Sequence, residues 1–176
     1  MNTPNGSSFP LTVEPAGTSE EMRALGRRLA AVLRAGDLAI LSGPLGAGKT
    51  TLTQGIADGL GVRGPVTSPT FVIARVHPSL RSPVGPPLVH VDAYRLGSVL
   101  EMDDLDLDTD LATSVTVVEW GADRAEGLSE SRLEIEIAPA PTDVIDGDSP
   151  RTVRVTGVGS RWQDTQLPHV DSGNRL

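Results

Sequence analysis

The stretch that decides the fold of this chain is Gly43-Pro44-Leu45-Gly46-Ala47-Gly48-Lys49-Thr50. It fits the pattern G-x-x-x-x-G-K-T, the phosphate-binding P-loop, whose glycines let several backbone N–H groups point at phosphate oxygens. Lys49 is the one lysine in a chain with 15 lysine and arginine residues. A compact ammonium on a flexible stem suits point-charge contact with a β- or γ-phosphate, so its retention at this position favours a functional motif.

The residues on both sides of the motif supply the context that a P-loop needs. The apolar run 37–42 predicts a buried parallel strand before it, and 49–60 predicts a helix after it that ends at Gly61. The helix would add unpaired N–H groups and the positive end of its dipole, and the Thr50 hydroxyl is placed to ligate Mg²⁺. An ordinary glycine-rich turn is the alternative, but motif and context together favour nucleotide binding. The chain has no second lysine for the N-K-x-D loop typical of P-loop GTPases, which favours ATP over GTP.

The other periodic segments predict an α/β protein. A capping box at Thr18 to Glu21 predicts a helix with an apolar stripe, and Gly36 is its expected stop. Strands are predicted over 70–77, 88–92, 115–119, 133–137 and 152–158, with the first two antiparallel, and 98–111 is predicted to be helical in part. The expected architecture is a three-layer, P-loop NTPase-like fold with a mixed β-sheet. It would occupy residues 18–158, between a flexible N-terminal segment 1–17 and a flexible C-terminal tail 159–176.

Composition narrows the functional classes. The formal charge of −8 argues against broad non-specific binding to nucleic acid, which relies on basic patches. The chain has no cysteine, which excludes disulfides and thiolate metal sites and fits a reducing compartment. No apolar run approaches the roughly 20 residues that span a bilayer, and the first residues lack the pattern of a signal peptide. We therefore expect a cytoplasmic protein with no membrane partner.

Two acidic residues stand at the ends of predicted strands. Asp92 ends 88–92 and Glu119 follows 115–118. A P-loop enzyme uses an acid at such a place to hold Mg²⁺ directly or through water. Spacing alone leaves both residues open for this role, and the alternative for each is a polar residue that leaves a strand into solvent.

Four ordered blocks give the chain a resemblance to a known family. They are the P-loop 43–51, Thr67-Ser68-Pro69-Thr70-Phe71, the H-x-D-x-Y-R-L block 90–96, and Val118-Glu119-Trp120. With these blocks the chain resembles the TsaE (YjeE) family, bacterial ATPases required for making threonylcarbamoyladenosine in tRNA. The P-loop is generic, whereas the other three blocks in this order are much more specific. The resemblance covers about two-thirds of the chain, from Thr18 to Trp120.

The resemblance implies ATP and Mg²⁺ as cofactors and assigns roles to residues. Thr50 and Glu119 would be the metal ligands, and Asp92 and Lys49 the catalytic residues. Thr67, Ser68 and Thr70 would act as a switch loop. The nucleotide-binding residues would be Gly43, Leu45, Gly46, Ala47, Gly48, Lys49, Thr50, Thr51 and Trp120.

The resemblance also implies partners. The chain would hydrolyse ATP to cycle the TsaB–TsaD complex, would not transfer the threonylcarbamoyl group itself, and would meet tRNA only indirectly. Hydrolysis by the isolated chain would be slow. A P-loop small-molecule kinase and a non-hydrolysing ATP-sensing adaptor are the alternatives. One departure is that Gly121 and Ala122 follow the Glu-Trp pair, where many relatives have proline, which puts nucleotide contacts just beyond Trp120 in doubt.

Several residues have two interpretations at this stage. His90 shares the strand face of Asp92 and is either catalytic or, as we favour, a structural histidine. Arg95 is either an arginine finger or a member of a structural ion pair. The acids between 101 and 110 form either a docking face or, as we favour, a solvated surface. Trp120 and Phe71 are either core residues or residues that stack on adenine.

Overall fold

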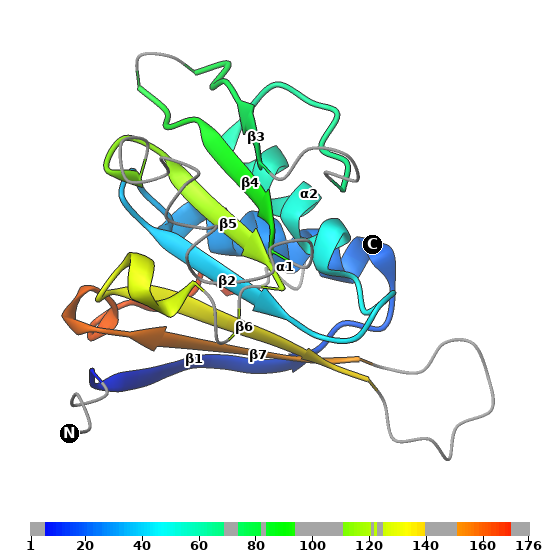
Figure 1. Ribbon diagram of the computed structural model, residues 1–176. Coiled ribbons are helices and arrows are strands. Elements are labelled where there is room, and N and C mark those ends of the chain that lie inside the picture. The colour runs from blue at the N-terminus through cyan, green and yellow to red at the C-terminus, as the bar shows by residue number, and fades with distance from the viewer. Residues whose placement is uncertain are drawn as a thin grey trace.

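The computed structural model describes residues 6–68, 74–81, 84–93, 111–120, 122, 125–139 and 151–169. Within these residues, one sheet has the strand order β1-β7-β6-β2-β5-β4-β3 (Figure 1). The strands are β1 (Ser8–Pro15), β2 (Leu38–Ser42), β3 (Ala74–His77), β4 (Leu88–Asp92), β5 (Val115–Glu119), β6 (Arg132–Ala138) and β7 (Thr152–Val158).

The sheet is mixed, as predicted. β6, β2, β5 and β4 run parallel to one another in its centre. β3 pairs antiparallel with β4, and β7 pairs antiparallel with both β6 and β1. Every residue of β4 and β5 is buried, which explains why these strands read as unbroken apolar runs. In β6 buried and more exposed residues alternate, as expected for a strand with one face on the core.

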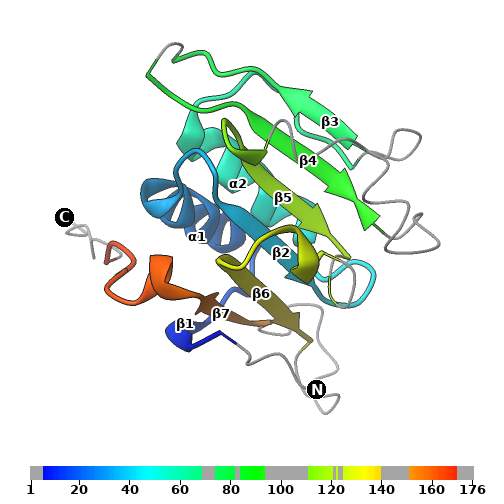
Figure 2. The same cartoon turned by 60° about the vertical axis from the view of Figure 1, so that its left-hand side comes forward.

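Two α-helices lie side by side against one face of the sheet (Figure 2). They are α1 (Ser19–Val32) and α2 (Lys49–Leu60). α1 begins with the predicted capping box: the Glu21 N–H donates to Thr18 Oγ1 at 3.1 Å, and the Thr18 N–H donates to the Glu21 carboxylate at 3.0 Å. The helices share the larger of two apolar clusters with β2, β5, β6 and β7. This packing fixes the start of α2 at the carboxyl end of β2.

The opposite face of the sheet carries a smaller apolar cluster. It includes Ile40, Val91 and Val118 from the central strands, and Ala125. Leu128, at the end of the 3-10 helix η2 (Glu126–Leu128), packs against it. Among the described residues, no helix is long and apolar enough to cross a membrane.

Both chain ends contribute more structure than the sequence predicts. Residues 8–15 form β1, which pairs with β7 from Ser8 opposite Val158 to Pro15 opposite Thr152. The 3-10 helix η3 (Ser160–Trp162) places Trp162 in the core with 1% of its surface exposed. Parts of the segments 1–17 and 159–176, which were predicted to be flexible, thus form a strand and a short helix that pack on the sheet.

Other differences are small. α1 ends at Val32 because Leu33 already has an extended conformation, so Gly36 is not its stop. The helices and strands predicted over 49–60, 88–92, 115–119 and 152–158 have the predicted bounds. The beginning of the strand predicted over 70–77 lies outside the described residues, and so does the helix predicted over 98–111 except Leu111.

Candidate nucleotide-binding site

The P-loop joins the end of β2 to the start of α2 and curves tightly. Gly46 and Gly48 have φ angles of 77° and 108°, in the left-handed region that favours glycine. A Cβ atom at Gly48 would lie 2.9 Å from Arg151 Nη1 and 3.2 Å from Met22 Cε. Glycine is therefore favoured at position 48 for two reasons. The backbone has a left-handed φ angle, and neighbouring side chains leave little room for a Cβ atom.

Lys49 is the first residue of α2, and its side chain turns back into the loop. Its Nζ donates to the carbonyl oxygens of Gly43 at 2.8 Å and Pro44 at 2.9 Å, and lies 3.7 Å from the centre of the Trp120 ring. Only 5% of the residue is exposed. Burial lowers the pKa of Lys49 from its ordinary value of 10.5, and the carboxylates of Glu119 and Asp92 offset part of this effect. The buried ammonium is a place where further negative charge would be stabilised.

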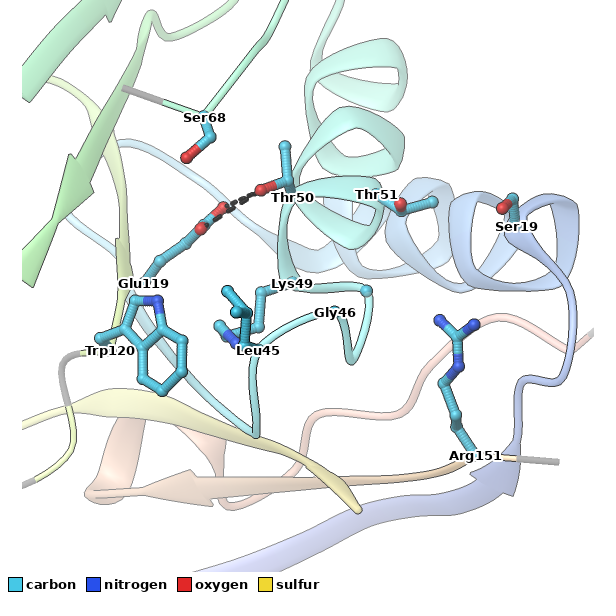
Figure 3. Close-up of a pocket in the computed structure, with 11 residues that line it drawn as sticks. Ser19, Leu45, Gly46, Lys49, Thr50, Thr51, Ser68, Glu119, Trp120 and Arg151 are labelled. Atoms are coloured by element: carbon cyan, nitrogen blue, oxygen red, sulfur yellow. Dashed lines mark hydrogen bonds between the residues drawn. The ribbon is translucent and has the colours of Figure 1, made fainter. Parts of the chain in front are cut away.

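Glu119 ends β5 and is the centre of a small polar network. Thr50 Oγ1 lies 3.2 and 3.3 Å from the two oxygens of its carboxylate (Figure 3). Thr53, one helical turn after Lys49, has its Oγ1 3.4 Å from Glu119 Oε1 and donates to the Lys49 carbonyl at 2.9 Å. The network thus links the first turn of α2 to the end of β5.

His90 completes this network from β4. The residue is fully buried, and its Nε2 lies 2.9 Å from Glu119 Oε1. Because a carboxylate oxygen accepts, Nε2–H is the donor. Nδ1 has no hydrogen-bond partner among the described residues. His90 does not line the pocket described below, so the geometry favours the structural interpretation of this histidine.

Asp92 and Trp120 frame the same network. Asp92 ends β4 directly beside Glu119 in the strand register and is 8% exposed. Trp120 has a φ of 61°, which is uncommon for a residue with a side chain, and its N–H donates to the Leu41 carbonyl at 2.9 Å. This turn directs the indole ring over the Lys49 ammonium.

A pocket of about 360 Å³ opens above these groups. Its size is in the range of ligand-binding clefts, roughly 300–1,000 Å³. The sequence-predicted residues that line it are Leu45, Gly46, Gly48, Lys49, Thr50, Thr51, Ser68, Glu119 and Trp120. The structure thus brings residues from the P-loop, Ser68 and the end of β5 to one cavity.

The remaining predicted site residues have other positions. Gly43, Ala47, Thr67 and Asp92 do not line the pocket, although the Gly43 carbonyl accepts from Lys49. Thr70 lies outside the described residues. Sequence reasoning missed three contributors, Ser19 and Arg151 in the pocket wall and Thr53 beside Glu119. Thr53 could have been predicted, because a residue four positions after Lys49 lies on the same face of the helix. No local sequence pattern marks Arg151.

The donor set at Glu119 suits one kind of metal ion. A hydroxyl and a carboxylate are hard oxygen ligands, and Mg²⁺ is typically bound by one or two such protein groups together with waters and substrate phosphates. Over the described part of the chain, no group of three or more His, Cys, Asp or Glu residues is arranged to hold a metal by itself. Thr50 and Glu119 therefore fit an ion that arrives with a phosphate ligand.

A glycine-rich loop between a buried parallel strand and a helix, with lysine at the start of that helix, defines an α/β protein of the P-loop NTPase-like class. Comparison with known families is more specific. The family model described as "Threonylcarbamoyl adenosine biosynthesis protein TsaE" matches residues 16–144. The chain belongs to the TsaE family.

Individual relatives agree. The tRNA threonylcarbamoyladenosine biosynthesis protein TsaE of Streptomyces coelicolor is 66% identical over 142 residues, which cover 80% of this chain and 93% of that protein. The protein of the same name from Bacillus subtilis is 39% identical over 153 residues, 86% of this chain and 87% of its own length. The crystal structure of Bacillus subtilis YdiB superposes with a TM-score of 0.66 and 32% identity, covering 89% of this chain and 90% of YdiB.

Proposed function

We propose that this chain binds ATP with Mg²⁺ in the pocket and hydrolyses it, and that this ATPase cycles the TsaB–TsaD complex during threonylcarbamoyladenosine formation in tRNA. One observation carries the chemical part of the proposal. Lys49 and Thr50 at the start of α2 meet Glu119 at the end of β5, within one pocket. Membership in a threonylcarbamoyladenosine biosynthesis family supports the pathway.

The P-loop residues bind the phosphates in this proposal. Backbone N–H groups at the start of α2 and the positive end of its dipole favour an anion. Lys49 exchanges its bonds with the Gly43 and Pro44 carbonyls for bonds with β- and γ-phosphate oxygens. The exchange is favourable because a buried ammonium interacts more strongly with a full negative charge than with a carbonyl dipole.

Thr50 and Glu119 would hold the Mg²⁺ that accompanies the nucleotide. When bound, this ion neutralises charge that develops on the phosphates. Thr50 and Glu119 already face each other at 3.2 Å, and His90 holds the carboxylate in place by donating to it. The protein has therefore fixed the orientation of this carboxylate before the ligand arrives.

Asp92 would act as the acid that orients or deprotonates the attacking water. Its place beside Glu119 in the register supports a role close to the γ-phosphate. Ser68 in the pocket wall supports the proposed switch role of the segment that contains Thr67 and Thr70. Trp120 would close the pocket on the Lys49 side.

Partners would supply what the chain itself lacks for fast hydrolysis. Within the described residues, the positive groups that line the pocket are Lys49 and Arg151. Lys49 serves binding, and a slow basal rate is expected until TsaB and TsaD complete the site. The chain would not transfer the threonylcarbamoyl group, and its contact with tRNA would be indirect.

Calorimetry and reconstitution test the proposal. ATP with Mg²⁺ should give a binding signal with the folded protein and none with Lys49→Ala. With TsaB, TsaD and tRNA, modification should require the wild-type chain, while Asp92→Asn should bind ATP yet support little turnover. Fast hydrolysis that is indifferent to the partners would contradict partner activation. Transfer of labelled γ-phosphate to a metabolite instead of water would identify a kinase.

A further inference from the structure

The segment that leads from the end of α2 to the pocket, residues 63–68, has one buried anchor. These residues belong to no helix or strand, and among them only Val66 is buried, with 7% of its surface exposed. Two residues later, Ser68 lines the pocket together with Thr50 and Glu119. Two residues span at most about 7 Å of chain, so the position of Val66 limits where Ser68 can lie.

Gln54 of α2 holds the backbone of this anchor. Its Nε2 donates to the Val66 carbonyl at 2.9 Å, and its Oε1 accepts from Nη2 of Arg23, in α1, at 3.3 Å. A carbonyl group only accepts and a guanidinium only donates, so these two neighbours determine which way the Gln54 amide is oriented. The side chain therefore ties the segment 63–68 to both helices.

Gln54 also has a fixed position relative to the groups that would meet the terminal phosphate. It lies four residues after Thr50, one turn further along the same face of α2. Figure 3 shows Ser68 on the side of the pocket where Thr50 and Glu119 lie. One helix thus carries the hydroxyl proposed to bind Mg²⁺ and, through Gln54, the part of the chain that leads to Ser68.

We propose that Gln54 is a positioning residue that makes the site sensitive to the γ-phosphate, because it holds the Val66 carbonyl and thereby places the start of the switch loop. The inference rests on the proposed function, in which Thr50 and Glu119 mark the γ-phosphate end of the pocket. Ser68 lines the pocket beside them, where ATP differs from ADP. Gln54 itself does not line this pocket. Its loss should therefore weaken binding of ATP and leave binding of ADP intact.

Three substitutions at this one position separate the two contacts of Gln54. Gln54→Met has a similar length and removes both contacts. Gln54→Glu keeps an acceptor for Arg23 but has no donor for Val66, whereas Gln54→Lys keeps a donor for Val66 and has no acceptor for Arg23. Calorimetry then measures the binding of ADP and of a non-hydrolysable ATP analogue, both with Mg²⁺, to the wild type and to each variant.

Loss of the donor should be selective for the triphosphate. Gln54→Met and Gln54→Glu should raise the Kd of the ATP analogue by about threefold to tenfold, the effect of one hydrogen bond, and should leave the Kd of ADP unchanged. Gln54→Lys should restore the wild-type ratio of the two Kd values, because its ammonium donates to the Val66 carbonyl. The rescue by a donor is the result that identifies the contact with Val66 as the cause.

A merely structural role of Gln54 gives a different order of variants. If Gln54 served only to join α1 to α2, Gln54→Glu would equal the wild type, because its carboxylate still accepts from Arg23, and Gln54→Lys would be the impaired variant. That order overturns the inference. Equal losses for ADP and the analogue also overturn it, since they would indicate a disturbed P-loop, and so do unchanged affinities in all variants. If Gln54→Met does not fold, the comparison of Gln54→Glu with Gln54→Lys decides.

This inference and the proposed function fail in different ways. If the wild type binds ADP and the ATP analogue, and the Gln54 variants bind both with the same affinities, only the role of Gln54 falls. If the wild type binds neither nucleotide, the proposed function falls and the inference falls with it.

Discussion

Gly55 in α2 is where the two helices approach each other most closely through their backbones, and Gly55→Ala is the sharpest test of this packing. A Cβ atom at Gly55 would lie 2.3 Å from the Arg23 carbonyl oxygen and 2.8 Å from the Arg23 α-carbon. Gly26 faces it from α1, since its Cβ would lie 2.5 Å from the Leu52 carbonyl oxygen. These are backbone atoms, so α1 cannot relieve the clash by a rotamer change.

The expected magnitude follows from two opposing terms. In an unpacked helix, replacing glycine by alanine stabilises by about 1 kcal/mol. Here the helices must separate by roughly 1 Å to reach ordinary contact, and such overpacking costs about 1–3 kcal/mol, occasionally more. Separation also loosens the apolar cluster between α1 and the sheet. Because the clash is with backbone atoms, we take the upper end of this cost, about 3 kcal/mol. The expected net loss is then about 2 kcal/mol in the free energy of unfolding, or a fall in Tm of roughly 4–8 °C.

Urea unfolding followed by circular dichroism measures this loss. Gly127→Ala is the control, because no heavy atom lies within 4 Å of a Cβ built at Gly127 in η2. The control should stay within about 0.5 kcal/mol of the wild type. If Gly55→Ala is as stable as the control, or more stable, the close contact between the helices is not as described.

Three further predictions concern the site. Glu119→Gln should raise the Mg²⁺ concentration needed for ATP binding by about tenfold, since it removes an ionic ligand, while calorimetry without Mg²⁺ should show similar affinity for both proteins. His90→Ala should lower the free energy of unfolding in urea by about 2–4 kcal/mol, because it leaves a cavity and takes a donor from the buried Glu119 carboxylate; full stability would contradict the network. Because burial lowers the pKa of Lys49 below 10.5, the unfolded chain holds this proton more tightly, so nucleotide-free protein should gain stability as pH rises between the folded pKa and 10.5. Lys49→Met should flatten that rise in urea midpoints, and an unchanged slope would assign it to other groups.

The sequence predicts the parallel centre of the sheet well and its edges less well. Strands β4 and β5 are unbroken apolar runs, which is the pattern of strands covered on both faces. β1 was missed because residues 1–17 are rich in Pro, Gly and Ser and because Pro10 interrupts the short alternation of apolar and polar residues, next to the register shift in its pairing with β7. Only the partner strand, far away in the sequence, makes this segment a strand.

The site divides in the same way. The P-loop is local, so its residues are recognisable from their spacing. The contact between Thr50 and Glu119 joins residues 69 positions apart, and spacing alone left Glu119 and Asp92 equivalent. Arg151 meets Ala47 across 104 positions and carries no motif, so only the fold reveals it. What was predictable is what the chain encodes within one strand, loop and helix.

The resting partners of the Lys49 ammonium are internal, two carbonyl groups and an indole ring. Any incoming anion has to displace these contacts. The loop therefore favours a ligand whose own contacts with Lys49 and its neighbours are stronger than the contacts that Lys49 loses. Inorganic phosphate can contact the loop and Lys49 alone and therefore recovers less. A chain of phosphates that also reaches the hydroxyl and carboxylate opposite recovers far more, which would protect the site from the abundant small anions of a cell.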